Sequence, residues 1–260
     1  MPDHYTYPGT DVLVNLPGYH DPALWKAAER RVITTHMADL ALHPVDGDFD
    51  LPHLQAIHAR LVEGFYPWGG RLRDTNTGPG GTGIAHCVPE FIPVETDRVL
   101  DALARMDHLR GRDRAGFSEG LAWTWGEVTA IHPFRDVNTR SQFVFFNQLA
   151  ESAGWLIDWN QIDPHVFAHA RTRAIDISED GIEALLHPAL VPARGIDGQE
   201  VRARMLRSAT EFTRPRVARE RNVLDRELRA ALQRRANRLD PDPPFNPPRD
   251  HGPEDRGLGL

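Results

Sequence analysis

The chain has 260 residues, of which 40% are hydrophobic and 26% charged, and its formal net charge is −7 at pH 7. This length supports one good core with a small appendage, and the composition is typical of a soluble globular protein. The absence of a run of about 18 apolar residues argues against a membrane span, and the N-terminal sequence lacks the basic head and apolar stretch of a secretory signal. Cys87 is the one cysteine and cannot form an internal disulfide, so a cytoplasmic location is the simplest interpretation.

The apolar spacing predicts a mainly α protein. Residues 1–20 are rich in proline and glycine and are expected to form an N-terminal arm, after which Asp21 and Pro22 have the form of an N-cap and first helical residue. Helices are predicted at 22–42, 51–64, 95–106, 115–131, 139–153, 164–175, 179–186 and, with an interruption, 198–237. The segment 139–153 is apolar on most sides, which is typical of the central helix of a bundle.

Two short strand-like segments, 71–76 and 83–87, flank a glycine-rich turn and predict one β-hairpin. We expect the core domain to occupy residues 21–192, a basic helical extension to occupy 193–237, and a proline-rich tail, 238–260, to be disordered.

The extension is basic but does not have the sequence features of a nucleic-acid-binding arm. Residues 199–238 hold 12 Arg against 5 Asp and Glu and lack a pattern of interleaved aromatic side chains, since Phe212 is the one aromatic residue among them. We therefore expect a solvated helix pair, with no nucleic-acid partner and no membrane partner.

The loop between the predicted helices 115–131 and 139–153 concentrates polar chemistry in a few residues. It reads His132-Pro-Phe-Arg-Asp-Val-Asn-Thr-Arg140 and carries a base, a carboxylate, an amide and a guanidinium. This sequence resembles the motif of the Fic/Fido (filamentation-induced-by-cAMP) family, His-Pro-Phe-x-Asp/Glu-Gly-Asn-Gly/Lys-Arg. The Tyr-Pro-Trp-x-Gly corner at 66–70, the predicted hairpin and the segments 126–131 and 158–163 also resemble that family, in the same order.

The resemblance implies a Fic-type helical bundle with one β-hairpin flap. It also implies a protein adenylyltransferase that transfers AMP from ATP, with Mg²⁺, to a Ser, Thr or Tyr hydroxyl of a target protein. Such an enzyme would need no membrane partner, and a separate antitoxin protein would be a further partner if it is the toxin of a toxin–antitoxin pair. The implied roles are general base for His132, metal ligand for Asp136, phosphate binding for Asn138, Thr139 and Arg140, structural anchor for Phe134, and target-binding flap for Arg73, Ile84, Ala85 and His86. A histidine with a pKa near neutrality suits a general base, carboxylate oxygen suits Mg²⁺, and a guanidinium suits phosphate.

The sequence departs from the family motif at three positions. Val137 and Thr139 stand where the family has its loop glycines, and Phe143 stands where a further arginine is usual. Valine at positive φ is strained, so either the loop does not need positive φ at 137 or the phosphate-binding loop is reshaped. Thr139 and Gln142 also fit a capping box, which would occupy the N–H groups that a phosphate needs.

These departures leave other interpretations open. The fold could transfer a phosphoryl or another nucleotide-derived group, or it could be a catalytically inactive binding protein. Asp136 and Asn138 could simply cap the following helix, and Arg140 could be a solvated surface charge. Neither Glu63-Gly64 nor Glu119-Gly120 has the preceding Ser or Thr of the family's inhibitory motif, so no internal inhibitor is expected.

Overall fold

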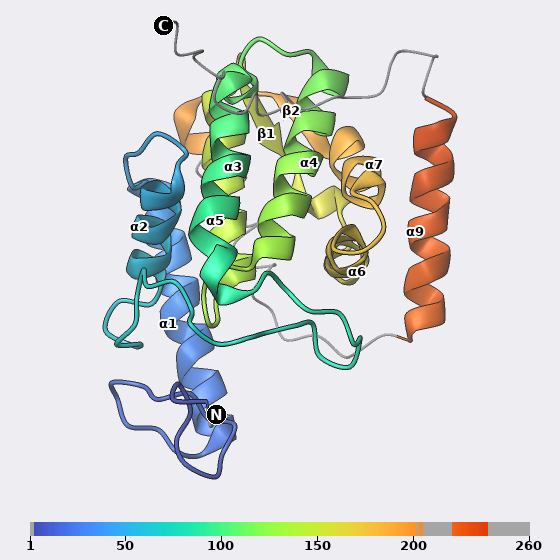
Figure 1. The fold of residues 1–260 in the computed structure, drawn as a ribbon. Coiled ribbons are helices and arrows are strands. Elements are labelled where there is room, and N and C mark those ends of the chain that lie inside the picture. The colour runs from blue at the N-terminus through green and yellow to red at the C-terminus, as the bar shows by residue number, and fades with distance from the viewer. Residues whose placement is uncertain (1–2, 202, 205–219, 239–260) are drawn as a thin grey trace, which may run out of the picture.

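The computed structural model describes residues 3–201, 203, 204 and 220–238 and is mainly helical, as predicted (Figure 1). Its α-helices are α1 (Pro22–Leu42), α2 (Leu51–Leu61), α3 (Ile92–Arg105), α4 (Arg114–Ile131), α5 (Asn138–Ser152), α6 (Pro164–Ala174), α7 (Asp180–Ala189) and α9 (Arg221–Ala236). Short 3-10 helices lie at Pro89–Phe91, Asp107–Leu109 and Trp159–Gln161, and two strands at β1 (Trp155–Ile157) and β2 (Leu190–Pro192). The predicted helices from 22–42 to 179–186 agree with these bounds to within a few residues, whereas of the predicted segment 198–237 most of 202–219 lies outside the described residues and α9 begins only at Arg221.

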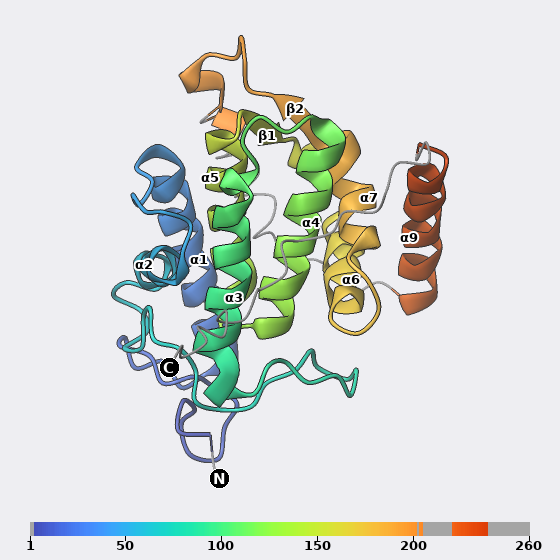
Figure 2. The same cartoon turned by 45° about the horizontal axis from the view of Figure 1, so that its top comes forward.

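Helices α3, α4 and α5 run side by side, with α1 and α2 on one side of them and α6, α7 and α9 on the other (Figures 1 and 2). The middle of α5 supplies Phe145, Phe146 and Leu149 to the core, each with no exposed surface. Trp125 of α4 stacks on Phe146 with ring centroids 4.5 Å apart. Burial on nearly all sides explains why the α5 sequence lacks a clear polar face.

Local sequence signals set several helix starts. The Asp21 carboxylate accepts hydrogen bonds from the N–H groups of Ala23 and Leu24, and Asp163 caps α6 in the same way. Both are followed by proline at the first helical position, where the missing N–H costs nothing. None of the helices in the described part of the chain combines the length and the low polarity that crossing a membrane requires.

The two strands do not lie where the hairpin was predicted. Strands β1 and β2 pair antiparallel, Trp155 opposite Pro192, and join segments far apart in sequence. Residues 71–87 instead form an extended loop without strand structure, which we call the flap; it crosses beneath the lower ends of α3 and α4 (Figure 1). Its two arms share a backbone hydrogen bond from His86 N–H to the Thr77 carbonyl, 3.0 Å. The prediction of a chain reversal was correct and the prediction of two strands was wrong, because neither arm completes a ladder with the other.

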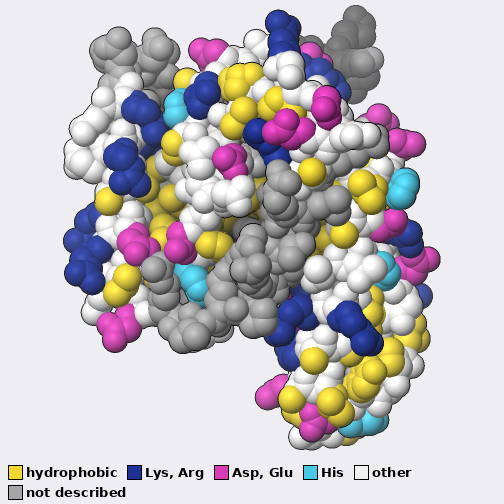
Figure 3. Space-filling view, turned by 180° about the vertical axis from the view of Figure 1, so that it is seen from behind, with side chains coloured by type: hydrophobic (Ala, Val, Ile, Leu, Met, Phe, Trp, Pro, Cys, Tyr) yellow, Lys and Arg dark blue, Asp and Glu magenta, His cyan; other side chains and the backbone are white. Residues whose placement is uncertain are grey.

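Helix α9 belongs to the described part of the predicted basic extension and packs on α6 and α7. Leu228 is buried there, and Arg235 pairs with Glu183 of α7, Nε to Oε2 2.6 Å. Seen from behind, Lys and Arg side chains lie among Asp and Glu (Figure 3). The prediction of a solvated helix pair is therefore wrong for α9, because one face of this helix is buried against α6 and α7. The predicted disordered tail lies, from residue 239 onward, outside the described residues.

Candidate active site

The motif loop connects α4 to α5 through two residues in the left-handed region. His132 follows α4 with φ 51° and ψ 64°, and Val137 precedes α5 with φ 63° and ψ 7°. This conformation costs an L-residue roughly 1–2 kcal/mol and is worst for a β-branched side chain. Val137 nevertheless buries its side chain in the core, where 2% of its surface is exposed. The loop therefore does require positive φ at 137, and valine adopts the conformation that glycine would take without strain.

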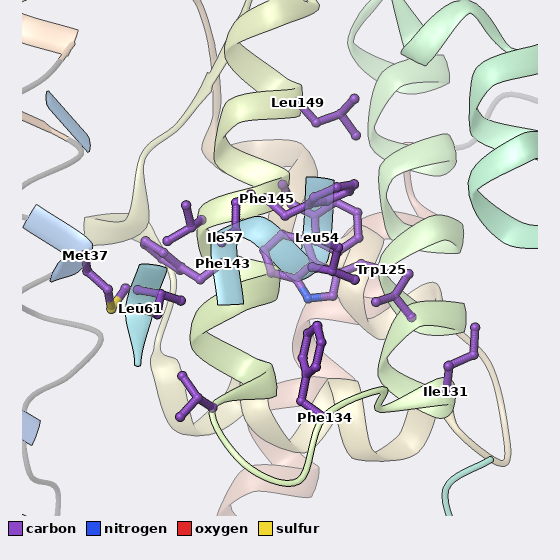
Figure 4. Close-up of a cluster of buried hydrophobic side chains, with 14 of the residues drawn as sticks. Met37, Leu54, Ile57, Leu61, Trp125, Ile131, Phe134, Phe143, Phe145 and Leu149 are labelled. Carbon is purple, nitrogen blue, oxygen red and sulfur yellow. The ribbon is translucent and has the colours of Figure 1, made fainter. Parts of the chain in front are cut away.

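Phe134 and Asn138 hold the loop from inside. Phe134 points from the loop up into the cluster of buried side chains that includes Trp125 (Figure 4), and its ring stacks on His58 with centroids 3.8 Å apart. The Asn138 side chain accepts from the Phe134 N–H, 2.9 Å, and donates to the Phe134 carbonyl, 2.7 Å. The expected anchor lies in the core. The expectation that the Asn138 amide donates to a phosphate needs correction, because the loop backbone already uses both ends of that amide.

Arg73 fastens the flap to the motif loop. Its guanidinium donates to the carbonyls of Ile131 (3.0 Å), His132 (2.7 Å), Thr75 (2.7 Å) and Cys87 (2.5 Å), and 2% of its surface is exposed. A cation at the last carbonyls of α4 is also favoured by the helix dipole. The prediction that Arg73 contacts a target is therefore wrong for its side chain, whose donors are already used by these carbonyls.

The rest of the flap reaches the loop through its two ends. The N–H of Arg73 donates to the Pro133 carbonyl and the N–H of Cys87 to the Ala130 carbonyl, each at 2.9 Å. Ile84 is half-buried and Ala85 exposed, so these two positions remain accessible on the flap. The flap is thus fixed at its base on either side of His132.

His132 lies in a strongly perturbed environment. Its ring stacks on that of His86, with centroids 3.8 Å apart and planes 5° apart, and its Nδ1 is buried without a hydrogen-bond partner among the described residues. The pKa of His132 lies well below its ordinary value of 6.5. Burial is the largest cause, and the neighbouring His86, Arg171 and Arg73 lower it further. Burial and the same two arginines lower the pKa of His86 to about 4. Both imidazoles are therefore neutral at pH 7, the state in which a histidine can accept a proton.

Val137, the N-cap of α5, has no side chain that can cap the first turn, and no other side chain of the described residues caps it. Thr139 and Gln142, which predicted a capping box, turn instead toward Arg171 of α6: the guanidinium donates to Thr139 Oγ1 at 3.0 Å and to Gln142 Oε1 at 2.7 Å. The capping-box prediction is wrong because the N-cap of α5 is Val137, two residues before Thr139, so Thr139 already lies inside the helix. An uncapped helix start, with its N–H groups and dipole, favours an anion.

Arg140 extends from the same turn of α5 and meets a buried carboxylate on α1. Its Nη2 lies 3.2 Å from Glu29 Oε1 and 3.7 Å from Asp136 Oδ1. The same Glu29 oxygen accepts from the Tyr66 hydroxyl at 3.1 Å, and Lys26 approaches Glu29 at 3.6 Å. Glu29 and Arg171 were missed by the sequence reasoning, because neither has a local pattern that distinguishes it from an ordinary helical residue.

Asp136 has the properties of a Mg²⁺ ligand. Its Oδ1 accepts from the Val137 N–H at 2.6 Å, while Oδ2 lies 4.0 Å from the Lys26 ammonium and has no nearer charged partner in the described part of the chain, and the side chain is partly exposed. Mg²⁺ is commonly bound through one or two carboxylates together with substrate phosphates. One oriented carboxylate beside an uncapped helix start fits that arrangement.

The sequence comparisons agree with this geometry. Residues 48–150 match the model of the Fic/DOC family. The chain is 34% identical over 173 residues to "probable protein adenylyltransferase y4lH" of Sinorhizobium fredii, an alignment that covers 66% of this chain and 88% of the relative. This chain belongs to the Fic/DOC family. A second Fic relative, protein adenylyltransferase VbhT of Bartonella schoenbuchensis, is 33% identical over 186 residues, 71% of this chain and 38% of VbhT.

Solved Fic structures have the same fold. The N-terminal Fic domain of a cell filamentation protein from Bartonella quintana, solved with bound ADP, superposes with a TM-score of 0.68 at 23% identity and covers 73% of this chain and 95% of that one. BepC from Bartonella tribocorum, solved with bound AMPPNP, superposes with a TM-score of 0.67 at 23% identity and covers 72% and 96%. At this identity the likeness concerns the fold.

Proposed function

We propose that this chain is a protein adenylyltransferase that transfers AMP from ATP to a hydroxyl side chain of a target protein. One observation carries the proposal: the start of α5 is free of side-chain caps and lies beside a neutral His132. An anion site next to a base is what the transfer of a phosphate-containing group to a hydroxyl requires. The names of the relatives support AMP as the transferred group.

In this proposal His132 is the general base. The neutral imidazole accepts the proton of the attacking hydroxyl, and the stacked ring of His86 fixes its plane. Arg73 contributes by holding the carbonyls of Ile131 and His132, which sets the position of the imidazole at the end of α4.

The nucleotide phosphates occupy the first turn of α5 in this proposal. The N–H groups of Asn138, Thr139 and Arg140 face outward from the helix start, and the Arg140 guanidinium adds a charged donor. Asp136 would hold Mg²⁺ with its exposed oxygen, and the ion when bound would neutralise phosphate charge. Val137 supports this assignment, because it preserves the backbone conformation that a glycine loop would have.

The flap is the proposed target-binding element. Its fixed base lies beside His132, and the exposed backbone near Ile84 and Ala85 is available for an extended peptide to add alongside. A target segment held there would bring a Ser, Thr or Tyr hydroxyl to the imidazole. A separate antitoxin is the second partner that we propose, since the sequence contains no internal inhibitory motif.

The test is to incubate the protein with a bacterial lysate and ATP labelled at either the α- or the γ-phosphate, with Mg²⁺, beside the variant His132→Ala. We expect protein-bound label from α-labelled ATP alone, and none with the variant. Label from γ alone would instead indicate a phosphotransferase. If neither label is transferred, and labelled CDP-choline also gives no transfer that depends on His132, the chain is a binding protein and the proposal is wrong.

A further inference from the structure

Arg171 of α6 is a buried cation that has no counter-charge among the described residues. Only 6% of its surface is exposed, and its three donor groups reach Thr129 Oγ1 (3.3 Å), Thr139 Oγ1 (3.0 Å) and Gln142 Oε1 (2.7 Å). All three acceptors are uncharged, and within the described ranges no carboxylate forms an ion pair with this guanidinium. Burial lowers the pKa of Arg171 to about 10, which still leaves it charged at pH 7. Burying a charge without a partner is unfavourable, so its retention calls for an explanation.

The position of Arg171 explains why a buried charge would be retained there. Thr139 lies in the uncapped first turn of α5, so the guanidinium is one hydrogen bond away from the proposed phosphate site, on its inner side. Arg171 also lies close enough to His132 and His86 to disfavour their protonated forms. Its positive charge therefore acts on the base and on the anion site together.

The same region lacks a charge that the family motif usually carries. Phe143 stands at the second arginine position, is 4% exposed, and packs against Trp159 with ring centroids 4.7 Å apart. No cation can act from that position. Arg171 of α6 does bring a positive charge to the first turn of α5, where its guanidinium contacts Thr139.

We propose that Arg171 is a positioning residue that replaces the missing motif arginine, strengthening the binding of nucleotide phosphates through the first turn of α5. This inference rests on the proposed nucleotide site but does not require that AMP be the group transferred. The alternative is that Arg171 only connects α4, α5 and α6 through its hydrogen bonds.

The experiment measures the binding of ADP and of uncharged adenosine by calorimetry to the native chain, Arg171→Met, Arg171→Lys and Thr129→Val. Arg171→Met removes the charge and keeps the bulk, and Arg171→Lys keeps the charge with fewer hydrogen bonds. Thr129→Val removes one acceptor and leaves the guanidinium charge, so it is the matched control for the connection between helices. We expect Arg171→Met to weaken ADP binding about tenfold with adenosine binding unchanged, and the other two variants to stay within about threefold of the native chain.

A second readout does not involve the nucleotide. Among the residues that the structure describes, the charged or titratable groups that act on the His132 imidazole are His86 and Arg73 from the flap and Arg171 from α6. Histidine NMR titration should therefore show a rise in the pKa of His132 in Arg171→Met and little change in Arg171→Lys and Thr129→Val.

The outcomes separate the two proposals. Arg171 only connects helices if the native chain and Arg171→Met bind ADP with equal affinity. The same conclusion follows if all three variants lose ADP affinity in proportion to the fall in their melting temperatures. If Arg171→Met does not fold, Arg171→Lys decides the question. A loss of ADP affinity in Arg171→Lys that its loss of stability fully accounts for would also show that Arg171 only connects helices. ADP binding that depends on charge at 171, without AMP transfer, would support this inference and overturn the proposed function. No ADP binding by the native chain would overturn both.

Discussion

Val137 offers a direct test of whether the motif loop is held in the left-handed conformation. Its φ of 63° is unfavourable for any side chain with a Cβ, and its own side chain is buried. Two substitutions separate these effects. Val137→Ala removes two buried methyl groups but keeps the Cβ, whereas Val137→Gly removes the Cβ as well and relieves the backbone strain.

The expected magnitudes follow from these differences. Loss of two methyl groups should destabilise Val137→Ala by roughly 1.6 kcal/mol. Val137→Gly avoids the left-handed penalty of roughly 1–2 kcal/mol, and loses about 0.4–1 kcal/mol through the greater freedom of glycine in the unfolded chain. The difference between these two terms makes Val137→Gly more stable than Val137→Ala by about 0–1.6 kcal/mol.

The assay is urea unfolding of both variants, with Val144 as the matched control. Val144 is also buried on α5 but lies in the helix interior, where Val144→Gly should be less stable than Val144→Ala by about 1 kcal/mol. Opposite orders at 137 and 144 are the expected result. The same order at both positions, with alanine more stable, would refute a strained left-handed conformation at Val137.

Three further predictions concern charge and protonation. Burial lowers the pKa of His58 to about 3, so the unfolded state binds more protons between pH 6.5 and 3, and the free energy of unfolding decreases as the pH is lowered through that window. His58→Gln, which keeps an acceptor for the Gly70 N–H, should reduce this slope by about 1.4 kcal/mol per pH unit in urea titrations. An unchanged slope would contradict the buried neutral imidazole. The lowered pKa of His132 keeps the base unprotonated, so the rate of transfer should stay level from pH 8 to 6.5 and decline only below that; a midpoint at or above 6.5 would exclude His132 as the titrating base. Glu29→Gln removes the carboxylate that competes with phosphate for Arg140 and should tighten ADP binding about threefold, whereas weaker binding would show that Glu29 mainly orients the guanidinium.

The sequence by itself determined the features that depend on neighbouring residues. Apolar spacing and caps such as Asp21-Pro22 predicted the α-helices, because both signals depend on residues a few positions apart in the sequence. The motif from His132 to Arg140 indicated the family and the candidate site. The domain limits and the roles of the motif residues remain predictions. The hairpin failed because glycine-rich turns indicate a reversal but not whether the arms complete a ladder.

Only the tertiary structure decided which polar groups meet. Arg140 contacts Glu29 across 111 residues of sequence, and Arg171 takes the acceptors of Thr139 and Gln142 that local spacing had assigned to a capping box. Long-range partners of this kind depend on how α1 and α6 pack against α5, which no local pattern encodes. For the same reason the sequence could not predict whether Val137 has a positive φ. The packing of its side chain and the start of α5 together set that angle.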